Sequence, residues 1–268
     1  MTRDVVIFDI EASCEDRKIN PNYNMETIEI GAVKVRQGNI VDKFETFIKP
    51  EYVTELTDYC VELTGITYAD LENAPLFSEG ILDFYDFIYG CDIYSSGNFD
   101  RKKLTQELRE KGYNSEHELA MNAIDSSHTD LKKHYNNITG KKKKGMPGMA
   151  AELGIELTGT HHRALSDSLN LTKIYLKLED IRKEELEKTF NEKNISKLIA
   201  SLNANHDFKI TVNGKHYRVE DSRANKVHKY TLVDFLDRYK DLILKDVDIR
   251  GLSYLSPPKL QVLKRYCK

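Results

Sequence analysis

The sequence predicts an α/β fold in which a mixed β-sheet is flanked by helices, followed by a small α+β C-terminal module. Three observations support this prediction. Residues 5–10 form a nearly continuous apolar run, which is typical of a strand buried on both faces. Two more strand patterns follow, and helical patterns then alternate with a short strand at 92–95. Near the C-terminus, Asn213-Gly214 joins two alternating segments and predicts a hairpin.

The first 180 residues contain the predicted sheet and the helices around it. Strands are expected at residues 5–10, 27–35 and 40–48, with a turn at 37–39 and Pro50 ending the third strand. Apolar residues at helical spacing, bounded by turn residues, predict the remaining elements. These are helices at 54–63, 78–90, 101–111, 129–135, 148–153 and 166–186, and the short strand at 92–95.

The chain changes character after the long helix. A polar helix is expected at 191–205, a hairpin at 208–219 and another helix at 231–244. We therefore predict one domain at residues 1–185 and an accessory module at residues 186–268, which matches no module of known function.

Composition excludes several classes of protein. The 268 residues have a mean hydropathy of −0.54, and no apolar run approaches the roughly 20 residues of a membrane span. Met1 to Asp4 lead directly into the first strand, which leaves no room for a signal peptide. The four cysteines are scattered without a CxxC pair, so neither a zinc site nor a disulfide framework is expected. We expect a soluble, cytoplasmic protein with no membrane contact.

Charge is unevenly distributed along the chain. Residues 1–180 carry 21 Lys and Arg against 31 Asp and Glu, whereas residues 181–268 carry 19 against 12. The basic C-terminal part suggests a polyanionic partner, although uneven drift of surface charges would give the same split. The run Lys141–Lys144 is either a solvated loop or a phosphate contact.

The first strand ends in two carboxylates, Asp9 and Glu11. Side chains on a strand alternate between its faces, so these two point to the same side. Like charges at this spacing repel unless cations or protons lie between them, and a buried strand does not ordinarily carry them. The alternative is an exposed, charged strand end.

Two distant segments supply possible partners. Asp100 opens a helix after the short strand, where it would also serve as an N-cap. His162 and Asp167 are five residues apart, about 140° around a helix, so they would not share one helical face. With His162 on a loop and Asp167 on the first helical turn, both can reach one site. His161 competes with His162, and Asp167 alone is typical of a helix start.

Together these residues form a D-x-E pair on the first strand, a middle Asp and an H-x4-D pair. This set resembles the DEDDh branch of the DnaQ-like 3′→5′ exonucleases over about residues 4–180, and the H-x4-D spacing separates it from the sister branch that uses Tyr. The segment 56–67, with Asn73-Ala74-Pro75 downstream, is similar to the subgroup that trims small RNAs and histone-mRNA ends, which includes KapD-like bacterial proteins.

The resemblance implies a ribonuclease-H-like fold and two-metal hydrolysis of phosphodiesters. Oxygen ligands suit Mg²⁺ or Mn²⁺ rather than zinc. By the resemblance, Asp9 bridges two ions, Glu11 and Asp167 hold the ion that binds the attacking water, and Asp100 supports the second ion. His162 is the implied general base, and the products are nucleoside 5′-monophosphates.

The expected partner is the 3′ end of a single-stranded nucleic acid, with RNA favoured. The resemblance implies terminal-nucleotide contacts from four residues, namely Ala12, Leu63, Thr64 and Phe99. Leu63 and Thr64 would equally suit a helix C-terminus closed by Gly65, and Phe99 would equally pack beneath the site. A DNA exonuclease of the proofreading or repair type and a non-catalytic nucleic-acid-binding regulator are the alternatives. The sequence leaves the oligomeric state open.

Overall fold

A computed structural model describes residues 3–111, 114–189, 199–200, 203, 208–213, 216–221 and 226–230. The chain divides into two compact units, Met1–Lys177 and Leu178–Lys268. The helix predicted at 231–244 lies outside the described residues, as does most of the helix predicted at 191–205.

The first unit is built on a five-stranded mixed sheet with the strand order β3-β2-β1-β4-β5. β1 pairs with β2, and β2 with β3, in the antiparallel sense, whereas β4 is parallel to β1 and β5 is parallel to β4. This arrangement confirms the predicted mixed sheet. The strands are β1 (Val5–Ala12), β2 (Thr27–Arg36), β3 (Asn39–Phe47), β4 (Asp92–Ser95) and β5 (His128–Asp130).

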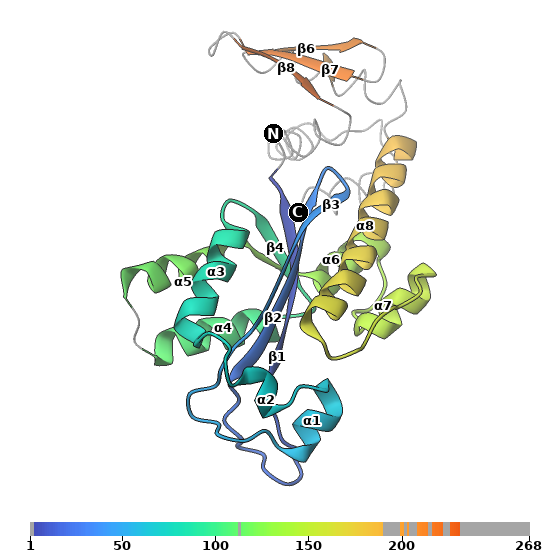
Figure 1. Ribbon diagram of the computed structural model, residues 1–268. Coiled ribbons are helices and arrows are strands. Elements are labelled where there is room, and N and C mark those ends of the chain that lie inside the picture. The colour runs from blue at the N-terminus through green and yellow to red at the C-terminus, as the bar shows by residue number, and fades with distance from the viewer. Residues whose placement is uncertain are drawn as a thin grey trace. The chain divides into compact units, whose positions relative to one another are not determined.

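Helices cover both faces of this sheet (Figure 1). One face carries α3 (Phe77–Ile88), α4 (Phe99–Glu110) and α5 (Ser115–Ser127). The other face carries α6 (Leu131–Thr139), α7 (Met146–Leu153) and the first part of α8 (Ala164–Thr189). Two short helices, α1 (Asp58–Thr64) and α2 (Tyr68–Leu71), lie near the C-terminal end of β1.

The two faces of β1 differ in chemistry. Val6, Phe8 and Ile10 are buried in the main apolar core, where the rings of Phe8 and Phe84 lie 5.4 Å apart. Each fully buried side chain of this size contributes about 1.5–3 kcal/mol to the stability of the fold. Asp9 and Glu11 occupy the alternate positions of the strand and therefore face the opposite, α8 side. The apolar core on one face of β1 thus fixes the strand that carries the two carboxylates on its other face.

Several elements differ from the sequence expectation, among them the short helix α2, which has no predicted counterpart. The helix predicted from residue 54 begins at Asp58, because the Thr57 hydroxyl accepts the Cys60 amide and caps it there. The helix predicted from residue 129 begins at Leu131, after the short strand β5, which pairs with β4. α5 was not predicted, because its buried residues are only His117, Ala120 and Ile124, a stripe too narrow to stand out in a polar segment.

The described part of the second unit contains an antiparallel sheet of β6 (Phe208–Asn213), β7 (His216–Asp221) and β8 (Lys226–Tyr230). The first two strands form the predicted hairpin. None of the helices described in either unit has the length and apolar character needed to cross a bilayer.

Candidate active site

Asp9 and Glu11 lie on the same side of β1, and their nearest partner is Asp167 at the start of α8. One carboxylate oxygen from each of the three residues lies within 4.8 Å of the others. Glu11 and Asp167 are buried, while Asp9 is partly exposed. Three carboxylates this close are stable only with protons or cations between them.

The start of α8 reaches this position because β2 has no side chain in its way. A Cβ at Gly31, which pairs with Asp9 across the sheet, would lie 2.1 Å from the backbone nitrogen of Leu165. The Ser168 hydroxyl donates to the Gly31 carbonyl oxygen at 2.8 Å. The helix backbone is therefore packed directly on the sheet, which places Asp167 beside the carboxylates of β1.

Asp100 approaches from α4, on the other side of the sheet. It is 5% exposed, and its Oδ2 atom has no hydrogen-bond partner among the described residues. Asn98 occupies the N-cap position of α4, so Asp100 is not the cap. The Ser95 hydroxyl at the end of β4 contacts Asp100, and it lies 2.9 Å from Nε2 of His128. A buried carboxylate oxygen without a partner fits a position for a cation ligand.

The electrostatics of the cluster favour the neutral form of its acids in the absence of a cation. Burial, followed by the charges of Asp100 and Glu11, raises the pKa of Asp9 well above its usual range. Burial and then the charge of Asp167 raise the pKa of Glu11 to about 8. Burial raises the pKa of Asp100 to about 6, against the lowering effect of its hydrogen bond with Ser95. A divalent cation would replace these protons, so the residues fit a metal site.

The structure distinguishes the two adjacent histidines. Nδ1 of His161 lies 2.9 Å from Oδ2 of Asp167, whereas His162 donates its backbone amide to that oxygen at 3.2 Å. His162 has a φ of 60°, a left-handed conformation that is uncommon for a residue with a side chain. Burial, and then the charge of His161, lower its pKa. Both rings can donate a nitrogen to the same small region as Asp167.

The residues expected to contact substrate lie on three segments. Ala12 is buried at the end of β1, and its carbonyl oxygen is 3.9 Å from the Cys60 sulfur of α1. Leu63 is half-buried on α1, and Phe99 is 50% exposed at the start of α4. The two apolar side chains are therefore at least partly accessible.

Thr64 is buried and uses its hydroxyl within its own helix end. Oγ1 donates to the Cys60 carbonyl oxygen at 2.8 Å and accepts from the Ile66 amide at 3.1 Å. Gly65 follows in the left-handed conformation and donates to the Val61 carbonyl oxygen, which ends α1. The helix-end interpretation of this segment is therefore present in the structure, and the Thr64 hydroxyl already has two partners.

The lysine run is paired on the surface. Lys141 and Lys144 form ion pairs with Glu152 at 3.5 and 2.5 Å, and Lys143 lies 3.7 Å from Asp130. These side chains are about half exposed, so the ion pairs contribute little to stability and leave the lysines accessible.

Two residues that shape the site were missed in the sequence, Glu29 and Gly31 of β2. Glu29 is fully buried and lies opposite Glu11 in the register of β1 and β2. It forms an ion pair with Arg163 at 2.8 Å. The signal that could have found them is a charged residue and a glycine in the first, mostly apolar half of the strand predicted at 27–35.

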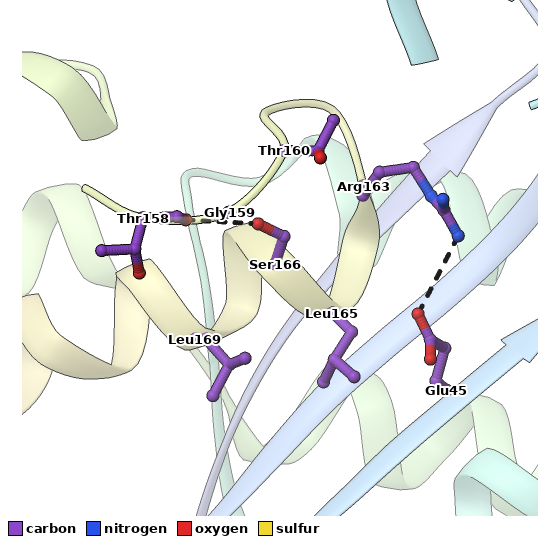
Figure 2. Close-up of a pocket in the computed structure, with 8 residues that line it drawn as sticks. All are labelled: Glu45, Thr158, Gly159, Thr160, Arg163, Leu165, Ser166 and Leu169. Atoms are coloured by element: carbon purple, nitrogen blue, oxygen red, sulfur yellow. Dashed lines mark hydrogen bonds and ion pairs between the residues drawn. The ribbon is translucent and has the colours of Figure 1, made fainter. Parts of the chain in front are cut away.

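A shallow pocket of about 330 Å³ lies beside the loop at 158–160, between β3 and the start of α8 (Figure 2). None of the four acidic residues lines it. Figure 2 shows Arg163 extending toward Glu45, 4.0 Å away. Its lining residues are Glu45, Thr158, Gly159, Thr160, Arg163, Leu165, Ser166 and Leu169.

Comparison with known proteins identifies the family. Residues 6–175 match the sequence pattern of the family described as Exonuclease, and this range contains all the acidic residues and both histidines described above. The protein named "Probable 3'-5' exonuclease KapD" from Bacillus subtilis is 31% identical over 191 residues, which cover 70% of this chain and 89% of KapD.

A DNA polymerase III of the PolC type from Caldanaerobacter subterraneus is 30% identical over 175 residues. This match covers 65% of the chain but spans only 11% of the length of the polymerase. Among solved structures, the nuclease domain of 3'hExo, a DEDDh family member bound to rAMP, has a TM-score of 0.59 at 23% identity. It covers 67% of this chain and 92% of that domain, and it shows the same ribonuclease-H-like fold.

Proposed function

The chain belongs to the exonuclease family, and from this membership we propose that it removes nucleotides one at a time from the 3′ ends of single-stranded nucleic acid, with RNA favoured. The products would be nucleoside 5′-monophosphates. The observation that carries the proposal is the convergence of Asp9, Glu11 and Asp167 within 4.8 Å. Asp100 adds a charge that acts on Asp9 and a buried Oδ2 with no hydrogen-bond partner in the described part of the chain.

The four carboxylates are the residues that would hold divalent cations, with Mg²⁺ or Mn²⁺ the ions that suit an all-oxygen ligand set. Two bound cations would activate a water molecule and neutralise charge on the leaving oxygen. The raised pKa values of Asp9, Glu11 and Asp100 support this assignment, because they reflect buried and crowded negative charge that bound cations would neutralise in place of protons.

His162 is the proposed general base, and His161 is the competing candidate. The lowered pKa of His162 supports the choice, since the neutral ring able to accept a proton prevails at neutral pH. Its place beside Asp167 would let it take the proton of a water molecule held at the carboxylate cluster.

The terminal nucleotide would lie against the end of β1 and the start of α4. Leu63 and Phe99 offer apolar surface on which a terminal base can stack. Because the Thr64 hydroxyl is already bonded within α1, we assign the sugar contact at this segment to backbone groups of Thr64 and Ala12.

The preference for RNA rests on the likeness of residues 56–67 to the RNA-trimming subgroup. The second candidate is a DNA exonuclease, which is favoured by the 30% identity to a PolC-type DNA polymerase. A cytoplasmic location is part of the same proposal.

The test is 3′-end shortening of matched RNA and DNA oligomers labelled at the 5′ end, in Mg²⁺, in Mn²⁺ and in EDTA. We expect single-nucleotide ladders with either metal, faster on RNA, and none in EDTA. Faster cleavage of DNA would favour the second candidate. No cleavage of any oligomer with either metal would indicate a non-catalytic nucleic-acid-binding protein instead.

A further inference from the structure

Glu29 is an unusual residue in the polar face of the sheet. It is fully buried, and it lies on the side of β2 that faces the same way as Glu11 of β1. A buried carboxylate is strongly unfavourable unless it is paired, and its charge also raises the pKa of Asp9 and Glu11. The charge of Glu29 therefore adds to the repulsion within the carboxylate cluster, and its contacts must offset this cost.

Both oxygens of Glu29 are occupied by donors from the segment that follows His162. Oε1 accepts from Nη2 of Arg163 at 2.8 Å, and Nε is shared between Oε1 at 3.1 Å and Oε2 at 3.3 Å. Oε2 accepts from the backbone amide of Ala164 at 2.8 Å. A bidentate Arg–carboxylate pair fixes orientation as well as distance.

We propose that Glu29 is a positioning residue, which holds His162 and Asp167 in the geometry that the reaction needs by fixing Arg163 and Ala164. This inference rests on the proposed function, and it assigns Glu29 no contact with substrate.

The backbone connects Arg163 to both functional side chains. The backbone amide of Asp167 donates to the Arg163 carbonyl oxygen at 2.9 Å. This hydrogen bond, with the i to i−4 spacing of an α-helix, ties Asp167 to Arg163. On its other side, His162 has its left-handed φ of 60°. A residue in this conformation persists only where its surroundings hold it, and Glu29 fixes the next two residues of the chain.

The chain offers a matched control in Glu45 of β3. Arg163 is 4.0 Å from Glu45, on the side of the pocket drawn in Figure 2, and 2.8 Å from Glu29. The Glu45 side chain is 48% exposed, whereas that of Glu29 is fully buried. An exposed carboxylate at that distance contributes little, so Glu45→Gln removes the same charge near Arg163 without removing the proposed contacts.

The first experiment compares Glu29→Gln with Glu45→Gln. Glutamine has one acceptor oxygen and would turn an NH₂ donor toward Arg163 or Ala164, so one of the two contacts is lost. We expect Glu29→Gln to lower kcat by about 10- to 100-fold, with KM changed by less than about twofold. Glu45→Gln should match the wild type. Equal activity in Glu29→Gln and the wild type would overturn the proposal.

The second experiment asks whether Glu29 acts through Arg163. Arg163→Met should lower kcat as Glu29→Gln does, and the double variant should lose no more than either single variant. Arg163→Lys, which keeps the charge but not the bidentate geometry, should restore part of the loss. If the fold-losses of kcat in the two single variants multiply in the double variant, the two residues act independently, and the proposal is contradicted. Arg163 is one-third exposed, so its variants carry the test if Glu29→Gln does not fold.

A Mn²⁺ titration by calorimetry, without nucleic acid, separates this proposal from the proposed function. If Glu29 positions Asp167, Glu29→Gln should bind Mn²⁺ about tenfold more weakly than the wild type and Glu45→Gln equally well. Equal Mn²⁺ affinity in Glu29→Gln would refute the positioning role. A wild type that binds Mn²⁺ but cleaves no oligomer would refute the proposed function, while the titration still decides the role of Glu29.

Discussion

The imidazole rings of His161 and His162 are stacked with their centroids 4.0 Å apart. Only His161 contacts the Asp167 carboxylate through its ring, and His162 contacts it through its backbone amide. Asp167 is one of the proposed cation ligands, so the His161 ring competes with a cation for the same oxygens. The general base should therefore be the second histidine, whose ring does not use them.

His162→Ala should lower kcat by about 10²- to 10⁴-fold near neutral pH, because the attacking water loses its proton acceptor. Activity should partly recover at higher pH, where hydroxide is more abundant. His161→Ala should keep most of its activity. Both are measured as pH–rate profiles at saturating oligomer, and a flat profile for His162→Ala, or the larger loss in His161→Ala, would transfer the role.

Asp9→Asn should lower kcat by several orders of magnitude while the protein remains folded. The substitution removes an anionic oxygen ligand at the centre of the carboxylate cluster, and cations in such sites supply several kcal/mol of transition-state stabilisation. Turnover above about a tenth of the wild-type value would show that the site is assigned wrongly. Circular dichroism provides the folding control.

Without divalent cations, stability should fall as the pH rises from about 4 to about 8. Folding raises the pKa of Glu11 from 4.5 to about 8 and that of Asp100 from 3.8 to about 6. In this window the native state holds protons that the unfolded chain has released, so the free energy of unfolding decreases with pH.

The measurement is the unfolding temperature in EDTA at pH 5 and at pH 8. We expect Tm to be lower at pH 8 by about 5 °C or more, and Mn²⁺ to restore it at pH 8. Asp9→Asn, which relieves part of the repulsion, should show a smaller difference between the two pH values. A Tm that is higher in EDTA at pH 8 than at pH 5 would contradict the description of the cluster.

Gly31→Ala should destabilise the protein and lower its activity together. The new Cβ would lie 2.1 Å from the Leu165 nitrogen and 2.3 Å from the Ala164 carbonyl carbon, and both are backbone atoms that cannot rotate away. Relief requires α8 to lift from β2, at a cost of about 1–3 kcal/mol or more.

Urea unfolding measures this loss, and Gly148→Ala is the control. At Gly148, within α7, a Cβ would lie 3.1 Å from Cβ and Cδ of Lys144, a much milder contact than at Gly31 that a small shift of Lys144 relieves, and alanine favours the helix. Its stability should change by much less than that of Gly31→Ala. Equal stability of Gly31→Ala and the wild type would show that the start of α8 is not held tightly on the sheet.

The elements that sequence predicts well are those whose pattern is local. The alternation in β1 predicts that Asp9 and Glu11 share a face, and the spacing of Asn98 to Asp100 after β4 predicts the start of α4 closely. Strand β5 is different, because its three residues have no pattern of their own and form a strand only by pairing with β4. Tertiary contact decides such an element.

The site shows the same division. The D-x-E and H-x4-D spacings are visible along the chain, and the structure brings Asp9, Glu11 and Asp167 together. Glu29 and Gly31 could not be understood in this way, because their partners lie more than 130 residues away in sequence, at Arg163, Ala164 and Leu165. Only the packing of α8 on β2 gives them a role.

The last prediction concerns the basic C-terminal module, whose boundary near residue 185 remains a prediction. The strand register of the second sheet places Arg218 and Lys229 side by side, with Lys209 on the neighbouring row of the same face. All three are exposed, and the opposite face is buried at Ile210 and Val219. Glu220 lies on the basic face and pairs with Arg218 at 3.0 Å, which leaves an excess of positive charge.

If this face binds the nucleic-acid backbone, each phosphate contact steepens log affinity against log salt by about 0.7 on single strands. The triple variant Lys209→Gln, Arg218→Gln, Lys229→Gln should then bind a long RNA more weakly, with a salt slope shallower by up to about 2. It should still cleave a small nitrophenyl nucleotide ester at the wild-type rate.

The control variant removes the same charge from exposed lysines of the first unit, Lys18, Lys43 and Lys177. Equal slopes in the two variants would mean that the module only packs against the rest of the chain or forms a dimer contact. A truncation near residue 185 would cut α8, which continues to Thr189, whereas these substitutions leave that helix intact.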